Sequence, residues 1–184
     1  VTQHGNEHHP TGKFIAHHYE RLTSKDLWNQ VSRAWFEIGT RHLLDFDFFI
    51  KLDIDSFLIP GNLRYHVSQW DPDSIHYFGH TVFEQSRNVK DPRAQFNVGA
   101  GYGVSRGLLK SLLPYLVRNY STPGVLPEEK CVDAIRWGED VKFGDCVRVV
   151  HPHLFPDNSK DRHFRDRFLP FEPSQHMMVM RLNS

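Results

Sequence analysis

The spacing of apolar residues indicates the first elements of the chain. Four of them recur at helical spacing after Ser24, a residue that can cap a helix, and these are Leu27, Val31, Trp35 and Ile38. The pattern predicts a helix from Ser24 to near His42. The run Phe48–Leu52 is apolar except for Lys51, which is typical of a strand covered on both faces. Residues 1–23 are polar and indicate a loop-rich lead-in.

Further along, short apolar segments alternate with breaks. Pro60-Gly61 interrupts the chain, residues 63–70 show a short helical pattern, and residues 76–79 predict a short strand. Residues 96–104 are small and rich in glycine, and Ser105 can cap the leucine-rich helix that follows. These patterns place helices and strands in alternation through the middle of the chain.

The last part of the chain continues this alternation. The acidic pair Glu139-Asp140 stands where another helix would begin, because carboxylates are stabilised at the positive end of a helix dipole. Val147–Val150 predicts a further strand. Alternating strands and helices predict an α/β layer architecture, and 184 residues fit a single domain.

Charge and composition limit the classes of binding partner that we expect. Lys plus Arg and Asp plus Glu balance at 22 each, so no net field attracts nucleic acid or an anionic membrane. No run of 18 apolar residues occurs, so we expect any membrane anchor to lie outside this chain. Cys131 and Cys146 could close a disulfide or remain buried free thiols, and both alternatives are open. Asn119 begins a glycosylation sequon, which favours a secretory protein.

Two aspartates follow the strand predicted at residues 48–52. In α/β sheets ligands bind beyond the carboxyl ends of strands, where Asp53 and Asp55 stand. Alternation along an extended backbone places both carboxylates on one side and Ile54 on the other. Oxygen ligands of this kind suit a hard divalent cation such as Mg²⁺ or Mn²⁺. The alternative is an ordinary solvated strand end.

Two further motifs have a functional and a structural interpretation. Gly99, Gly101 and Gly103 would let the backbone approach a bound ligand closely, although a tight turn from strand to helix explains the same residues. Asp140 or Glu139 could act as a general base, although helix capping also explains the pair. Neither motif alone decides between these interpretations.

Taken together, the order and spacing of the motifs resemble glycosyltransferase family 31, and most closely its core 1 β-1,3-galactosyltransferase branch. The resemblance runs from about Ser24 to Met177 and rests on the segments FFIKLDIDSFLIPGNLR, HYFGH, FNVGAGYGVSRGLLKSL, GEDVKFGDC and RFLPFEPSQHM. It implies a GT-A type α/β fold, with a Rossmann-like mixed sheet flanked by helices. Residues 1–184 would then be part of a catalytic domain, truncated at both ends.

The resemblance also assigns roles to residues. It implies that Asp55 and Asp53 bind the metal, and that both bind the nucleotide sugar together with Gly99, Ala100 and Gly101. Asp140 would be the catalytic base, with Glu139 beside it, and Cys131 would pair with Cys146. His176 is a further candidate active-site residue. A later histidine that completes the family's metal site has no counterpart here.

The implied function is an inverting, Mn²⁺-dependent hexosyltransferase. It would move galactose in β-1,3 linkage from a UDP-sugar to a glycan or glycoprotein acceptor such as O-linked GalNAc. Leu169 and Gln175 replace histidines of the core 1 branch, and Ile54 replaces a frequent third aspartate. Alternatives are a fringe-like UDP-GlcNAc transferase and a non-catalytic carbohydrate-binding or chaperone-like relative. The family implies a Golgi lumen location through a type II anchor, and is compatible with a homodimer.

Overall fold

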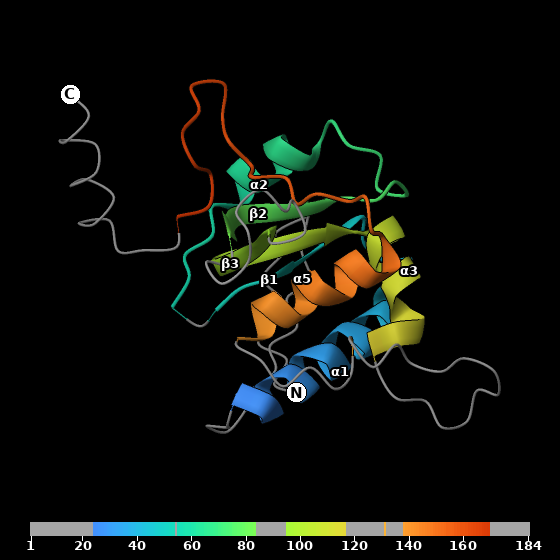
Figure 1. Ribbon diagram of the computed structural model, residues 1–184. Helices are drawn as coiled ribbons and strands as arrows, with labels where there is room; N and C mark the ends of the chain where they lie inside the picture. The colour runs from blue at the N-terminus through green and yellow to red at the C-terminus, as the bar shows by residue number, and fades with distance from the viewer. Residues whose placement is uncertain (1–23, 54, 84–94, 117–130, 132–137, 170–184) are drawn as a thin grey trace.

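A computed structural model describes residues 24–53, 55–83, 95–116, 131 and 138–169. Its helices and strands alternate in the first part of the chain, as the sequence predicts, but two strands and then two helices follow one another later on (Figure 1). In chain order they are α1 (Ser24–His42), β1 (Phe48–Lys51), α2 (Pro60–Val67), β2 (Tyr77–Phe83), β3 (Gln95–Ser105), α3 (Arg106–Leu116) and α5 (Glu139–Val150). The helix predicted from Ser24 to His42 and the strand predicted at Phe48 are confirmed.

The sheet has three strands in the order β1-β3-β2, and β3 pairs antiparallel with both neighbours. Strands β1 and β2 therefore run in the same direction. Residues 157–159 extend the sheet beyond β2, where Asp157 forms an isolated parallel bridge with Phe78. The fold is thus α/β, with antiparallel ladders among the described strands and one parallel bridge at the edge.

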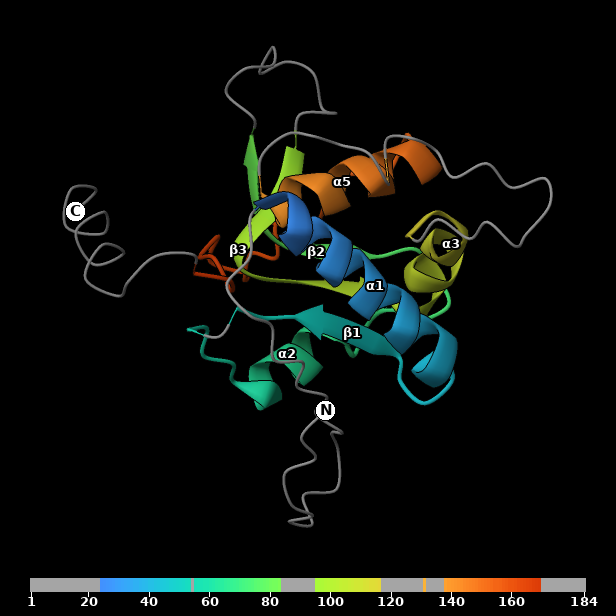
Figure 2. The same ribbon diagram turned by 90° about the horizontal axis from the view of Figure 1, so that it is seen from below.

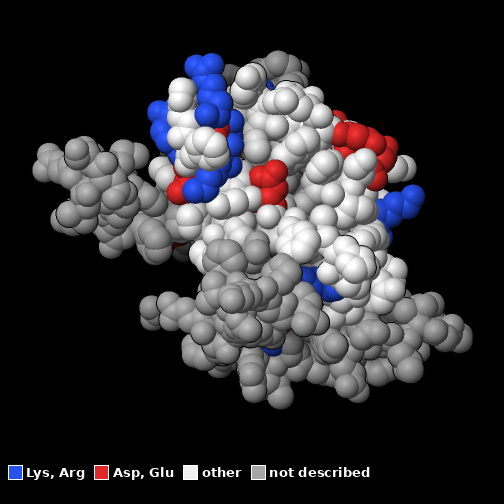
Figure 3. Space-filling view, turned by 45° about the horizontal axis from the view of Figure 1, so that its top comes forward, with Lys and Arg blue, Asp and Glu red and all other residues white. Residues whose placement is uncertain are grey.

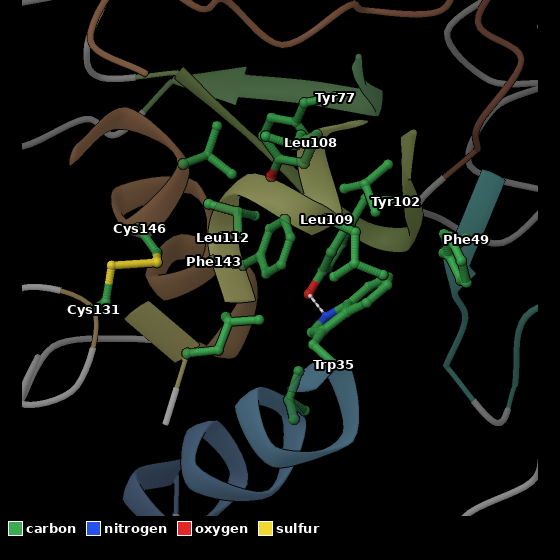
Figure 4. Close-up of a cluster of buried hydrophobic side chains, with 14 of the residues drawn as sticks. Trp35, Phe49, Tyr77, Tyr102, Leu108, Leu109, Leu112, Cys131, Phe143 and Cys146 are labelled. Carbon is green, nitrogen blue, oxygen red and sulfur yellow. Dashed lines mark hydrogen bonds between the residues drawn. A yellow bond between two sulfur atoms is a disulfide. The ribbon is translucent and has the colours of Figure 1, made fainter. Parts of the chain in front are cut away.

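Helices cover both faces of the sheet. Figure 1 shows α1, α3 and α5 on one face and α2 on the other, and Figure 2 shows α1 and α5 side by side in the helical layer. The larger core lies between the sheet and α1, α3 and α5; its buried members include Trp28, Trp35, Phe49, Tyr77, Tyr102, Leu108, Leu109, Leu112 and Phe143 (Figure 4). Gly39 lets α1 and α3 approach closely, because a side chain there would meet Leu113.

A smaller core fills the space between the sheet and α2. Phe78, Val67 and Phe168 are buried there, with Phe48 and Ile50 packed against them. Phe49 points the other way, into the larger core. Strand β1 is therefore covered on both faces, as its apolar run predicts, and only Lys51 carries a charge within it.

Two sequence predictions differ from the structure. Val147–Val150 is the last turn of α5 and not a strand, because buried Val147 and partly buried Val150 continue the helical face that includes Phe143 and Cys146. The glycine-rich segment is not a turn between strand and helix but lies within β3, the central strand. The turn follows at Ser105, whose hydroxyl accepts a hydrogen bond from the Leu108 amide at 3.2 Å, so the predicted cap is confirmed.

Cys131 and Cys146 form a disulfide and are both fully buried, so the implied pairing is confirmed (Figure 4). The bond ties Cys131 to α5 across 15 positions of sequence. A loop of this length stabilises a folded protein by about 3 kcal/mol on the chain-entropy estimate. We expect the double variant Cys131→Ala/Cys146→Ala to lose about that much free energy of unfolding in urea titrations. An unfolding midpoint that reductant leaves unchanged would contradict this expectation.

Among the described residues, no helix is both long enough and apolar enough to span a bilayer.

Candidate active site at the carboxyl edge of the sheet

Four chain segments meet at one edge of the sheet. Strand β1 ends at Lys51, which lies opposite Tyr102 of β3, and Tyr102 in turn lies opposite Gly79 of β2. Asp53 lies two residues after Lys51, and α5 begins at Glu139 on the helical side of the sheet. Residues that are far apart in sequence thus come together where β1 ends.

Lys51 joins two of the predicted site residues. Its ammonium donates a hydrogen bond to Asp53 Oδ1 at 2.5 Å and forms a second, close ion pair with Glu139 Oε1. Burial alone would lower the pKa of Lys51, but the charge of Glu139 and the hydrogen bonds to both carboxylates raise it above its ordinary value. Lys51 therefore stays charged and couples the end of β1 to the start of α5.

Glu139 is held deep in the protein by polar partners. Its side chain is 7% exposed, and Oε2 accepts a hydrogen bond from the Tyr102 hydroxyl at 3.1 Å. That hydroxyl also accepts one from Trp35 Nε1 at 3.3 Å (Figure 4). Burial raises the pKa of Glu139, and the Lys51 ammonium opposes part of this rise. Both carboxylate oxygens of Glu139 thus already have partners, one in Lys51 and the other in Tyr102. Glu139 is therefore placed to position these neighbours.

Asp140 is more accessible than Glu139. It is partly exposed in the first turn of α5, and Oδ1 accepts a hydrogen bond from the Val141 amide at 2.8 Å. A carboxylate in the first turn of a helix is stabilised by the helix dipole. Asp140 thus presents a carboxylate near the sheet edge, next to the buried Lys51–Glu139 pair.

Gly138 leaves the space that the Asp140 carboxylate occupies. A Cβ at Gly138 would lie 2.6 Å from Asp140 Oδ1, which is closer than such contacts allow. Because the clash involves the end of a flexible side chain, we expect Gly138→Ala to fold with nearly unchanged stability but to displace this carboxylate. Displacing a catalytic group by about 1 Å can cost about 100-fold in rate, so with Asp140 as the predicted base we expect turnover to fall by about tenfold or more.

Gly61→Ala is the matched control for this variant. A Cβ at Gly61 meets no atom within 4 Å, so its turnover and melting temperature should both stay at the wild-type level. Equal turnover of Gly138→Ala and Gly61→Ala would contradict the placement of Asp140 in the site.

The two aspartates after β1 are placed differently. Asp53 is 39% exposed and bound to Lys51, whereas Asp55 is exposed to solvent. Ile54 lies outside the described residues. Within the described part of the chain, no group of three or more His, Cys, Asp or Glu side chains is arranged to hold a metal ion. Two carboxylates still fit a hard cation that takes its other ligands from water and from phosphate oxygens.

The Gly-Ala-Gly segment forms a bulge in β3 at this same edge. Gly79 pairs with Tyr102 while the next residue of β2 pairs with Val98, so residues 99–101 are extra on the β3 side. Gly101 has φ +101°, and a Cβ there would lie 2.8 Å from the Lys51 carbonyl oxygen. Packing against β1 therefore requires glycine at this position. Bulges of this kind often lie beside active sites.

Other predicted residues are not described, and two site residues were not predicted. His176 and Asn119 lie outside the described residues. Lys51 and Tyr102 were missed, although Lys51 is the only charge in the β1 run, which could have singled it out. Their partner Glu139 is 88 positions from Lys51 in sequence, and no local pattern indicates such a contact.

A comparison with characterised proteins relates the chain to glycosyltransferases and confirms the resemblance to family 31. Over 155 residues, or 84% of its length, the chain is 27% identical to glycoprotein-N-acetylgalactosamine 3-beta-galactosyltransferase 1 of Xenopus laevis. It spans 38% of the length of that relative. No protein-family model matches the chain.

Proposed function

We propose that this protein is an inverting glycosyltransferase that uses a UDP-sugar as donor. The observation that carries the proposal is the ion-pair bridge from Asp53 through Lys51 to Glu139, which brings the motif after β1 and the motif at the start of α5 to one edge of the sheet. The similarity to a galactosyltransferase supports the same conclusion. A GT-A type fold is part of the proposal.

In the proposed reaction Asp140 is the general base. It takes the proton of an acceptor hydroxyl while the acceptor oxygen bonds to the anomeric carbon of the sugar. The bond from that carbon to the diphosphate breaks, and its electron pair leaves with UDP. Attack on the face opposite the leaving group inverts the configuration. Partial exposure of Asp140 would let an acceptor reach it, whereas Glu139 is buried.

Asp55 and Asp53 would hold a divalent cation, for which Mn²⁺ is the proposed choice. Such a cation, when bound, neutralises the negative charge of the diphosphate. Exposed Asp55 is the main proposed ligand, because Asp53 already accepts a hydrogen bond from Lys51. Gly99, Ala100 and Gly101 would line the donor pocket from the bulge in β3.

The finer assignments follow the relative that the chain resembles. We propose galactose as the donor sugar, O-linked GalNAc on a glycoprotein as the acceptor, and a β-1,3 linkage. A secretory location, in the Golgi lumen and with a membrane anchor outside this chain, fits this substrate. The buried disulfide also fits, because disulfides persist in oxidising compartments.

Calorimetry with UDP tests the donor and cation sites. We expect UDP to bind at least about tenfold more tightly with Mn²⁺ than with a chelator, and Asp55→Ala to lose this difference. Asp45→Ala is the matched control, because Asp45 is an exposed acid before β1, at the opposite end of the strand. Equal UDP affinity with and without Mn²⁺ would count against the cation site.

A further inference from the structure

A second surface lies at the same edge of the sheet and takes no part in the chemistry above. Residues 160–168, here called the basic loop, form a small hairpin closed by a bridge between Lys160 and Asp166. Figure 3 shows Lys and Arg side chains gathered at one corner of the molecule, where this loop lies. The exposed side chains of the loop include Arg162, Phe164, Arg165 and Arg167.

The basic loop has a defined conformation. Asp161 accepts hydrogen bonds from the amides of His163 and Arg165 and from Arg165 Nε, at 2.8, 3.0 and 2.7 Å. The backbone and side-chain hydrogen bonds from Arg165 hold the pKa of Asp161 well below its ordinary range. Phe168 anchors the far end of the loop in the smaller core. The loop is thus attached at both ends, and hydrogen bonds to the Asp161 carboxylate hold its conformation.

Phe164 is displayed at the tip at a cost to the fold. Its φ is 59°, a left-handed conformation that bulky residues rarely adopt, and its side chain is 83% exposed. Burial of the ring therefore does not offset the strain in the backbone. Strain of this kind, with no packing reason, is typical of residues that contact a ligand or partner.

The charges of the basic loop do not cancel. Arg165 pairs with Asp161, and Lys160 lies 3.5 Å from Asp166. Arg162 and Arg167 make hydrogen bonds, to His163 and to the Lys160 carbonyl oxygen, but no ion pair with an acid in the described part of the chain. Two exposed guanidinium groups thus flank an exposed phenyl ring.

The topology places the basic loop beside the candidate active site. Residues 157–159 run parallel to β2, and the Gly79 amide donates to Asp157 O and to Ser159 Oγ. Gly79 belongs to the row that includes Tyr102 and Lys51. The chain therefore leaves Ser159 toward the same edge at which it leaves Lys51 for Asp53. Figure 1 shows both segments and the start of α5 on one side of the molecule.

We propose that the basic loop docks an acidic segment of the acceptor polypeptide, with Arg162 and Arg167 facing carboxylates and Phe164 facing an apolar side chain. The proposal rests on the function proposed above, because only an acceptor that enters the site also reaches this loop. Polybasic membrane-binding segments cluster four to eight Lys and Arg residues. Here two aspartates stand among four cationic residues, which suits a short acidic peptide better than a bilayer.

Fluorescence anisotropy with two labelled glycopeptides tests the proposal. Both carry one O-linked GalNAc, which is flanked by glutamates in one peptide and by glutamines in the other. We expect the glutamate peptide to bind about tenfold more tightly at low salt, with the difference shrinking at high salt. Arg162→Ala/Arg167→Ala should remove this difference. Phe164→Asn, which tolerates the left-handed backbone, should weaken both peptides.

Arg33→Ala is the matched control, since Arg33 is an exposed arginine on α1. UDP affinity, measured in the same preparations, separates the two proposals. Retained UDP binding with equal affinity for both peptides would overturn docking by the basic loop and leave the proposed function standing. Binding of phosphatidylserine vesicles that depends on Arg162 and Arg167, with no preference between the peptides, would also overturn it. A wild-type protein that does not bind UDP would instead overturn the proposed function.

Discussion

Replacing Asp140 with Asn is expected to lower turnover by about 100- to 10,000-fold while UDP binding stays nearly unchanged. Asparagine keeps the shape of the side chain and can still accept the hydrogen bond from the Val141 amide. It cannot take a proton from the acceptor hydroxyl, and general base catalysis is typically worth about that factor. A loss in kcat without a loss in donor affinity would show that the interaction is made only in the transition state.

The variant Glu139→Gln distinguishes the role of Asp140 as the proposed base from the role of its buried neighbour Glu139. Glu139 is engaged by Lys51 and Tyr102, so we expect its replacement to affect stability more than turnover. Turnover should stay within about tenfold of the wild type, because the reacting groups are untouched. If Glu139→Gln loses activity while Asp140→Asn keeps most of it, the base is Glu139 and the assignment is wrong by one residue.

The second large effect is expected on stability. Lys51→Met leaves Glu139 without its cation, and Glu139 is 7% exposed. Removing one partner of a buried ion pair typically costs about 3–5 kcal/mol. Lys51 itself is 21% exposed, so water screens the pair in part and the cost should be about 3 kcal/mol at neutral pH. Urea unfolding, followed by circular dichroism, measures this loss.

The loss should depend on pH in a defined direction. Burial raises the pKa of Glu139 and the Lys51 ammonium opposes this, so in Lys51→Met the pKa rises further. The folded variant then binds a proton at a pH where the unfolded chain does not, and its free energy of unfolding increases as the pH falls through the folded-state pKa. The difference from the wild type should therefore be smaller at about pH 5 than at about pH 8.

Arg41→Met is the matched control for the buried pair. Arg41 pairs with Glu37 on the surface of α1, where the two side chains are 69% and 40% exposed. An exposed pair of this kind contributes at most about 1 kcal/mol. A loss in Lys51→Met no larger than in Arg41→Met, or one that grows as the pH falls, would contradict the role given to the buried bridge.

Local patterns in the sequence predict much of this fold. The apolar spacing after Ser24 predicts α1, and the apolar run at residues 48–52 predicts β1, because both elements bury their apolar side chains against the core. Val147–Val150 misleads, because β-branched residues also suit the end of a helix that is buried by its tertiary contacts. Residues 95–105 form the central strand because they pair with both β1 and β2. No local sequence pattern indicates these pairings.

The candidate site divides in the same way. The positions of Asp53 beyond a strand and of Asp140 in a first helical turn follow from local patterns and are confirmed. The ion pair between Lys51 and Glu139 does not follow from a local pattern, because these residues are 88 positions apart and only the folded chain brings them together. Its physical role could be recognised only once the burial of Glu139 was known.

The most direct test of the proposed function is sugar transfer itself. Purified protein is incubated with Mn²⁺, UDP-galactose and a GalNAc-bearing peptide, with UDP-GlcNAc in parallel, and the peptide is analysed by mass spectrometry and NMR. The proposed function predicts one added galactose in β linkage, one UDP released for each transfer, and transfer that is about 100-fold slower or more with Asp140→Asn. A protein that binds UDP but transfers no sugar from either donor, with the wild type and Asp140→Asn indistinguishable, would contradict it.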